Sequence, residues 1–290
     1  MSPTPATDTE YVLTISCPDR PGIVYSVAAF LVQHHGNIRA SQQFDDPLTG
    51  LFFLRMVFVC ADPQATVTTL RDGFAVVAQS FQMTWILSSA AEPTRTLILV
   101  SRLGHCLNDL LFRASIGALH IQVVGVLSNH EDFRDLVQRH QLPYHCVPVG
   151  PANKSAAEAE LLRLVAEERV DLVVLARYMQ VLSDDACKQL EARAINIHHS
   201  MLPSFKGARP YERARERGVK VIGATAHYVT SDLDEGPIIE QATARIDHSM
   251  SAADVAALGR DTECLALARA VRWHVQRRVF LDGRRTVVFR

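Results

Sequence analysis

The first ninety residues alternate between β-type and helical hydrophobic patterns. The segments cover residues 10–16, 23–34, 38–44, 51–59, 63–79 and 82–87. Their expected order is β-α-β-β-α-β. In the first helical segment, for example, Ile23, Val27 and Phe30 recur at helical spacing. This order predicts the split ferredoxin-like arrangement for a first domain at residues 1–89.

After a short linker at 88–94, apolar β-type runs alternate with helical patterns. The expected strands cover residues 96–101, 121–127, 144–147, 170–176, 194–197 and 219–229. Helices are expected after residue 107 and at 131–140, 155–169, 210–218 and 254–278, before a hairpin at 279–289. Strands that are apolar throughout are typical of parallel sheets covered on both faces. We therefore predict a doubly wound, mostly parallel α/β domain at residues 95–290.

Two of these helices carry local start signals. Asn129 precedes the helix expected from Glu131 and is a residue type that caps helices well. Ser155 and Glu158 have the spacing of a capping box at the next helix. Both signals predict side chains that satisfy the first N–H groups of their own helix.

Composition limits the classes of function. The 290 residues include 48% hydrophobic and 21% charged side chains, with a formal charge of −1, which is ordinary for two globular domains. This balance gives no bulk field for nucleic acid or a membrane surface, and no apolar run approaches the ~20 residues of a membrane span. The N-terminus has no signal-peptide pattern. Six scattered cysteines without a CxxC pair indicate reduced thiols, so we expect a cytoplasmic protein.

Polar residues suited to catalysis gather near the ends of two expected strands. They are an amide, two imidazoles and a carboxylate, residues that polarise carbonyls or move protons: Asn196, His198, His227 and Asp234. Asn196 and His198 alternate along a strand, so both can point into one cleft, whereas His199 should point away. Ligands of open α/β sheets lie at the carboxyl ends of the strands. No HExxH motif or Cys/His cluster occurs, so no metal is expected.

The motifs around these residues resemble the signature of the folate-dependent formyltransferase family. The matching strings are Asn196-Ile-His198, Ser200-x-Leu-Pro203 and Asp232-Leu-Asp234-x-Gly236-Pro237. Three longer strings are most similar to the deformylase branch of that family: His198–Ser200, Gly207–Tyr211 and Gly223–His227. The resemblance extends over nearly the whole chain, because members of that branch also carry an N-terminal ACT domain.

The resemblance implies hydrolysis of 10-formyltetrahydrofolate to tetrahydrofolate and formate, supplying one-carbon and purine metabolism. By similarity to the family, His198 polarises the formyl oxygen and Asn196 assists and orients. Asp234 matches the family's aspartate that deprotonates the attacking water, directly or through a relay. Folate is then the substrate, and no cofactor is implied.

The resemblance also implies contacts with the folate. The turn after residue 176 would cradle the pterin through Met179, Gln180, Val181 and Leu182, although Gln180 departs from the basic residue often found there. Further substrate contacts are expected from His227, Asp232 and Gly236. Lys206 or Arg209 could hold the glutamate tail, but the sequence does not decide this.

Two alternatives stay open. A formyltransferase that uses an amine such as glycinamide ribonucleotide would need a phosphate-binding loop, and family members of that kind have a glycine-rich one. Here the loop at residues 101–107 contains a single glycine, which favours water as the nucleophile. The second alternative is a non-catalytic, amino-acid-responsive regulator, and the joint presence of Asn196, His198 and Asp234 counts against it.

The turn Asp19-Arg20-Pro21-Gly22 resembles that of an ACT domain. Such domains commonly bind amino acids at subunit interfaces, so an amino-acid effector and a homo-oligomer are expected. Gly22 would open the N-terminus of the following helix to a carboxylate. In the simpler alternative, Pro21 and Gly22 only form a strand-to-helix turn.

Overall fold

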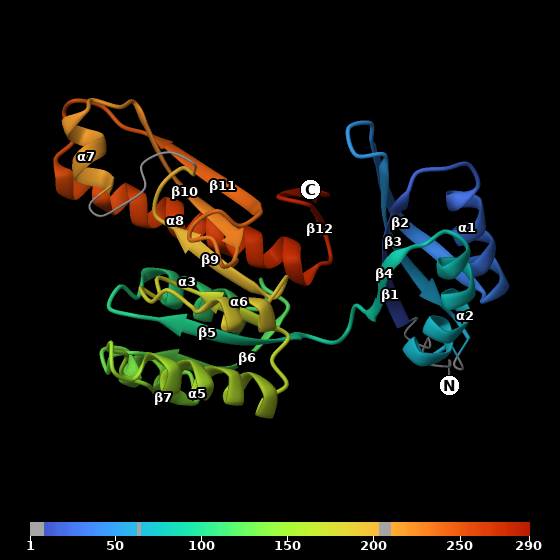
Figure 1. Ribbon diagram of the computed structural model, residues 1–290, viewed down its shortest axis with the longest axis horizontal. Coiled ribbons are helices and arrows are strands. Elements are labelled where there is room, and N and C mark those ends of the chain that lie inside the picture. The colour runs from blue at the N-terminus through green and yellow to red at the C-terminus, as the bar shows by residue number, and fades with distance from the viewer. Residues whose placement is uncertain (1–8, 63–64, 203–209) are drawn as a thin grey trace, which may run out of the picture. The chain divides into compact units, whose positions relative to one another are not determined.

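The computed structural model describes residues 9–62, 65–202 and 210–290 (Figure 1). The chain divides into two compact units, and each is described by itself. One unit comprises the residues up to 93 with 276–280 and 289–290, and the other comprises 94–275 with 281–288. The predicted domains at 1–89 and 95–290 did not anticipate that C-terminal residues join the first unit. As separately folding domains, the two ranges stay a prediction.

The first unit has the predicted β-α-β-β-α-β order. Its elements are β1 (Thr9–Pro18), α1 (Ile23–Gln33), β2 (Gly36–Asp46), β3 (Leu51–Cys60), α2 (Val67–Ser80) and β4 (Thr84–Ser89). The strands form an antiparallel sheet in the order β2-β3-β1-β4. Both helices lie on one face of this sheet (Figure 1), and their apolar side chains, among them Phe30 and Phe74, share a core with it. This confirms the ferredoxin-like arrangement.

The central strand β3 is buried along almost its whole length, not on alternate residues. The C-terminal residues of the chain explain this pattern, because they pack on the sheet within the same unit. The ring of Phe280 lies edge-on to that of Phe53 at 5.6 Å, and the Arg55 Nε–H donates to the Gln276 carbonyl at 3.0 Å. The strand is therefore covered on both faces.

The second unit is a seven-stranded sheet with the order β11-β10-β9-β8-β5-β6-β7. Its elements before the long C-terminal helix are β5 (Thr94–Val100), α3 (His105–Ser115), β6 (Ile121–Ser128), α4 (Arg134–Arg139), β7 (Tyr144–Cys146), α5 (Lys154–Glu167), β8 (Leu172–Leu175), α6 (Asp184–Gln189), β9 (Ala194–His198), α7 (Pro210–Glu216), β10 (Val221–Tyr228) and β11 (Ile238–Arg245). The five strands from β7 to β9 run parallel, and β10 and β11 are antiparallel to their neighbours. The prediction of a mostly parallel α/β sheet is confirmed.

The C-terminal part contains α8 (Ala252–Val275), β12 (Val279–Asp282) and β13 (Arg285–Val288). The long helix and the hairpin about Gly283 agree with the sequence pattern. Two elements were not anticipated, namely β11 and the short helix α6. In the part of the chain that the structure describes, no helix is both long and apolar enough to cross a membrane.

Both predicted capping signals were wrong. Helix α4 begins at Arg134 without a side-chain cap, because the Asn129 carboxamide instead accepts a hydrogen bond from the Ser101 hydroxyl at 2.7 Å. Helix α5 begins one residue earlier than expected, and its Glu158 accepts from the backbone N–H of Ser183 at 2.8 Å. Each polar side chain thus connects distant segments. Pro203, Lys206 and Arg209 lie outside the described residues.

Candidate active site

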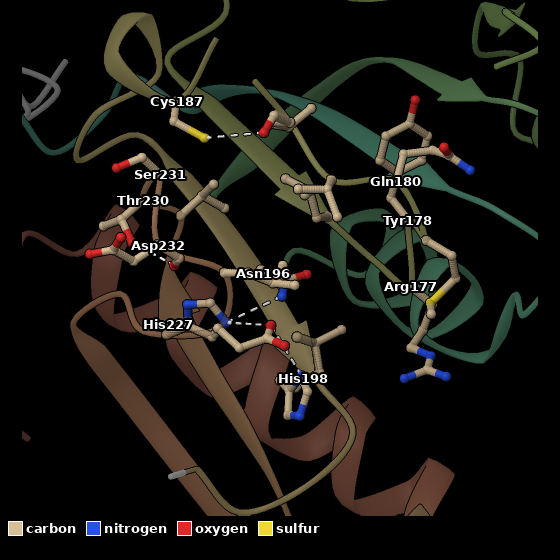
Figure 2. A pocket seen from close by; sticks show the side chains of 18 of the residues that line it. Arg177, Tyr178, Gln180, Cys187, Asn196, His198, His227, Thr230, Ser231 and Asp232 are labelled. Carbon is tan, nitrogen blue, oxygen red and sulfur yellow. Dashed lines mark hydrogen bonds and ion pairs between the residues drawn. The ribbon is translucent and has the colours of Figure 1, made fainter. Parts of the chain in front are cut away.

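A cavity of about 410 Å³ lies at the carboxyl ends of β8 and β9 and extends along the loop after β10 (Figure 2). This is the size of a small-molecule site, at the edge of the sheet where such sites form. Its lining residues fall within the segments 175–182, 196–199 and 227–234, together with Cys187. All three predicted catalytic residues are among them.

His227 fixes the orientation of Asn196. The Nδ1 atom of His227 lies 2.8 Å from the Tyr228 carbonyl, so it must carry the ring proton. Burial lowers the pKa of His227 and outweighs the opposing effects of that carbonyl and of Asp234, which keeps the ring neutral. Its Nε2 is therefore an acceptor, and the Asn196 amide nitrogen donates to it at 3.2 Å. The second proton of this amide stays available to the cavity that Asn196 lines.

His198 and Asp234 form the polar centre of the cavity. The Nδ1 atom of His198 lies 3.2 Å from Asp234 Oδ1, and His227 Nε2 lies 3.8 Å from the same oxygen. Figure 2 shows the side chains of Asn196, His198 and His227 converging at this point. The Nε2 atom of His198 is buried and has no hydrogen-bond partner among residues 9–62, 65–202 and 210–290. A buried polar atom without a partner is rare in proteins and indicates a place for a ligand atom.

Asp234 is ionised at neutral pH. Burial raises the pKa of this carboxyl, but the hydrogen bond from His198 and the nearby imidazoles lower it by more, so the pKa lies below its ordinary value. The backbone φ of Asp234 is +57°, in the left-handed region that Asp adopts more readily than most non-glycine residues. Its side chain is 18% exposed, so the carboxylate can reach a cavity ligand.

Gly236 supports the loop that carries Asp234. A Cβ atom at this position would overlap the carbonyl oxygen of Tyr228, so the backbone of the loop can approach β10 only with glycine. Gly236 is not among the described residues that line the cavity. Its expected substrate contact stays a prediction, and the structure gives it a role in backbone packing.

Period-two alternation predicted that His199 points away from the site, and this prediction was wrong. His199 also lines the cavity, and its ring stacks on that of His198 with centroids 4.9 Å apart. The regular strand ends at His198, so alternation no longer applies to the next residue.

The turn after β8 forms an apolar wall of the cavity. The side chains of Met179 and Val181 are 59% and 51% exposed, and they lie beside the buried Leu182. Gln180, His227 and Asp232 also line the cavity. The structure therefore brings together every predicted substrate-binding residue except Gly236.

A second polar cluster, missed from the sequence, adjoins the cavity. Its centre is Glu263 on α8, whose carboxylate accepts hydrogen bonds from His105 Nε2 at 2.7 Å and from the Tyr211 hydroxyl. The Nε of Arg177, a cavity-lining residue, lies 3.4 Å from Glu263 Oε2. We call these four residues the Glu263 cluster. The sequence signal that could have indicated this cluster was the position of Arg177 directly after the apolar run at 170–176.

One potential metal-binding group overlaps this cluster. Ligand atoms of His105, Cys106 and Glu263 lie within 4.8 Å of one another. The Glu263 oxygens already serve His105, Tyr211 and Arg177, and a guanidinium repels a cation. The donor set therefore fits a network of protein partners better than a metal centre.

The fold and this site define the chain as a folate-type formyltransferase domain joined to an ACT domain, and the comparisons agree. A formyl transferase family model matches residues 94–271 and an ACT domain model matches residues 11–72. The chain belongs to the formyl transferase family.

Particular relatives are more specific. Formyltetrahydrofolate deformylase of Corynebacterium sp. (strain P-1) is 51% identical over 97% of this chain and 98% of its own length. The deformylase of Bacillus subtilis (strain 168) is 48% identical over 96% and 93%. The crystal structure of formyltetrahydrofolate deformylase from Burkholderia mallei has a TM-score of 0.93 at 49% identity, covering 97% of this chain and all of that one. Glycinamide ribonucleotide transformylase 1 from Symbiobacterium toebii gives 0.65 at 29% identity, covering 70% of this chain and 97% of that one.

Proposed function

We propose that this chain hydrolyses 10-formyltetrahydrofolate to tetrahydrofolate and formate, as a supply of one-carbon units. The relatives that match along nearly the full length carry the name formyltetrahydrofolate deformylase. The observation that carries the chemistry is the buried Nε2 of His198, which has no partner in the described part of the chain and lies beside an ionised carboxylate in a cavity.

In the proposed reaction, the formyl oxygen occupies the position that faces His198 Nε2 and the second amide proton of Asn196. His198 donates to this oxygen through Nε2–H, and Asn196 donates in parallel. The developing negative charge then lies beside two preorganised donors, which lower the barrier by stabilising charge where it develops.

Asp234 takes the proton of the attacking water. Its lowered pKa keeps it ionised across the neutral range, and its partly exposed side chain lines the cavity. The water oxygen bonds to the formyl carbon, the bond from that carbon to N10 breaks, and N10 takes up a proton as tetrahydrofolate leaves. Formate is the second product, and no step requires a cofactor.

The apolar wall accounts for folate binding. Met179 and Val181 present exposed hydrophobic surface to the cavity, as an aromatic pterin requires. Gln180 and Asp232 add polar groups at its edge. We infer that these residues fix the pterin so that its N10 side points at His198.

The experiment is incubation of the purified chain with 10-formyltetrahydrofolate, with and without glycinamide ribonucleotide. We expect formate and tetrahydrofolate at the same rate in both mixtures. Formylated ribonucleotide would indicate a transferase instead, and absence of any turnover would indicate a non-catalytic regulator.

For the first unit we infer an amino-acid effector and a homo-oligomer, supported by the match to an ACT domain. Gly22 has φ +98° directly before α1, and the Arg20 guanidinium lies over the Phe81 ring at 4.4 Å. Asp19 and Pro21 complete this turn. Deletion of residues 1–90 should change oligomer size or response to amino acids. All six cysteines are free thiols, which supports a reducing compartment such as the cytoplasm.

A further inference from the structure

Arg177 has a backbone conformation that is costly for its residue type. Its φ is +65°, in the left-handed region that glycine adopts without strain. Ser101 holds this conformation from two sides: its N–H donates to the Arg177 carbonyl at 3.1 Å, and its hydroxyl accepts from the Met179 N–H at 2.9 Å. Strain of this kind persists where the surrounding structure enforces it, and it clusters at functional sites.

The Arg177 side chain connects the cavity with the Glu263 cluster. It is 9% exposed, lines the cavity, and faces Glu263 across 3.4 Å. Its Nε makes no hydrogen bond to any residue that the structure describes. In Figure 2 the guanidinium points away from Tyr178 and Gln180, toward the end of the cavity where His198 lies.

The Glu263 cluster also approaches His198 from the side of Tyr211 and α8. The Tyr211 ring packs so closely on α8 that a Cβ at Gly259 would overlap it. The same ring lies 6.5 Å from that of His199, which in turn stacks on His198. A series of side-chain neighbours therefore connects His198 through His199 and Tyr211 to Glu263.

Glu263 places a carboxylate beside the N-terminus of α3, where an anionic acceptor would otherwise find free backbone N–H groups. His105 is the first residue of α3, and its ring is bonded to the Glu263 carboxylate. Burial raises the pKa of Glu263, but the hydrogen bonds from His105 and Tyr211 and the charge of Arg177 lower it by more, so the group is ionised. The protein thus uses its own carboxylate at a position that attracts anions.

We propose that Arg177 determines the acceptor: its side chain, held by Glu263, fills the space beside His198 that an amine would need, so that only water attacks the formyl carbon. This proposal rests on the proposed function. In hydrolysis the water oxygen bonds to carbon and loses its proton to Asp234. In transfer the amine nitrogen would bond to carbon and lose its proton instead, giving a formyl amide. Tetrahydrofolate leaves with a proton on N10 in both cases. The space available to the nucleophile therefore determines whether hydrolysis or formyl transfer occurs.

The test is Arg177→Gly, which removes the side chain and relieves the backbone. The protein is incubated with 10-formyltetrahydrofolate and an excess of glycinamide, and formate and N-formylglycinamide are quantified by mass spectrometry. We expect formate alone from the wild type. In the variant, N-formylglycinamide should become detectable. The ratio of transfer to hydrolysis should then be roughly 10–200-fold higher than the upper limit measured for the wild type, which is the discrimination that a group filling a pocket provides.

Two matched controls separate the causes. Arg177→Met refills the space without charge, so it should keep the wild-type product ratio, and a rise in this variant would overturn the space-filling account. Arg169→Gly removes an exposed arginine with φ +48° just before β8, so it relieves the same backbone strain away from the cavity and should also keep the wild-type ratio.

An unchanged product ratio in folded Arg177→Gly would overturn the proposal. If that variant does not fold, Arg177→Gly with Glu263→Gln removes the uncompensated buried charge and is judged by the same ratio. Folding is checked by thermal melting and by binding of a folate analogue. Wild-type protein that releases no formate would contradict the proposed function, whereas formate with an unchanged ratio in every variant contradicts the role of Arg177 alone.

Discussion

The His198–Asp234 pair and Glu263 with its partners His105 and Tyr211 contain similar residue types but differ in how far their hydrogen bonds are satisfied. His198 keeps a buried nitrogen without a partner among the residues that the structure describes, and Asp234 is partly exposed in the cavity. Both oxygens of Glu263 have partners, and its side chain is 1% exposed. Polar groups with unused bonding capacity in a cavity serve a ligand, whereas saturated ones organise the structure around it.

This difference predicts opposite effects of mutation. Groups kept unsatisfied for a substrate contribute to catalysis at some expense of stability, so their replacement should reduce turnover and leave folding intact. Replacement of a saturated buried group should reduce stability first. The four predictions below test this contrast, from the largest expected effect to the smallest.

Asp234→Asn should have the largest effect. The amide keeps the shape of the side chain but cannot accept the proton of water, so we expect kcat to fall by a factor on the order of 10²–10⁴. Affinity for a folate analogue should change far less, because the proposed pterin contacts lie on the turn at 177–182. Single-turnover kinetics and equilibrium binding measure the two quantities. Wild-type turnover in this variant would make Asp234 a structural residue.

Glu263→Ala should mainly destabilise the fold. It leaves Arg177 buried without its counter-charge, and breaking a buried pair costs about 3–5 kcal/mol in the free energy of unfolding. Denaturant unfolding measures this change. Glu160→Ala is the control, because its partner Arg163 is a surface residue and such pairs contribute about 0–1 kcal/mol. Equal losses in the two variants would show that the Glu263 cluster is not structural.

His198→Ala should reduce kcat by roughly 10²–10³, as loss of an oxyanion donor does. The double variant with Asp234→Asn should lose less than the product of the two factors, because both groups act on one transition state. The rates of all four proteins complete the cycle. Fully multiplicative losses would mean that the two residues act independently.

His227→Gln should have the smallest effect, on the pH dependence of stability. The pKa of His227 in the folded protein lies below its ordinary 6.5. Below about pH 6.5 the unfolded chain takes up a proton that the folded chain does not, so stability is lost as pH falls toward the folded-state pKa. The variant removes this loss. Thermal melts from pH 7.5 to 5 should therefore decline less steeply than for wild type, and parallel curves would contradict a neutral, buried His227.

The sequence predicted features that depend on local spacing. Asn196 and His198 share one face of β9 because of the two-residue period, and both line the cavity. Two features depend on distant contacts and carry no local signal. Arg177 and Glu263 are 86 residues apart, and only folding pairs them. Strand β11 escaped detection because its alternation is broken by polar residues such as Glu240 and Gln241, which bond to neighbours inside the unit.

The predicted caps failed for the same reason. A polar residue before a helix satisfies that helix only when no stronger distant partner competes. Asn129 bonds to Ser101, and Ser101 also fixes the turn that contains Arg177. Local rules therefore predicted the residues that converge in the cavity, while the Glu263 cluster became visible only in the structure.

The most direct test of the account is a single turnover of 10-formyltetrahydrofolate in ¹⁸O-labelled water, with formate analysed by mass spectrometry. We predict one ¹⁸O atom in each formate from the wild type, formed together with tetrahydrofolate. In Asp234→Asn the rate of labelled formate formation should fall by a factor on the order of 10²–10⁴. Unlabelled formate, no formate, or labelled formate at an unchanged rate in the variant would contradict water attack assisted by Asp234.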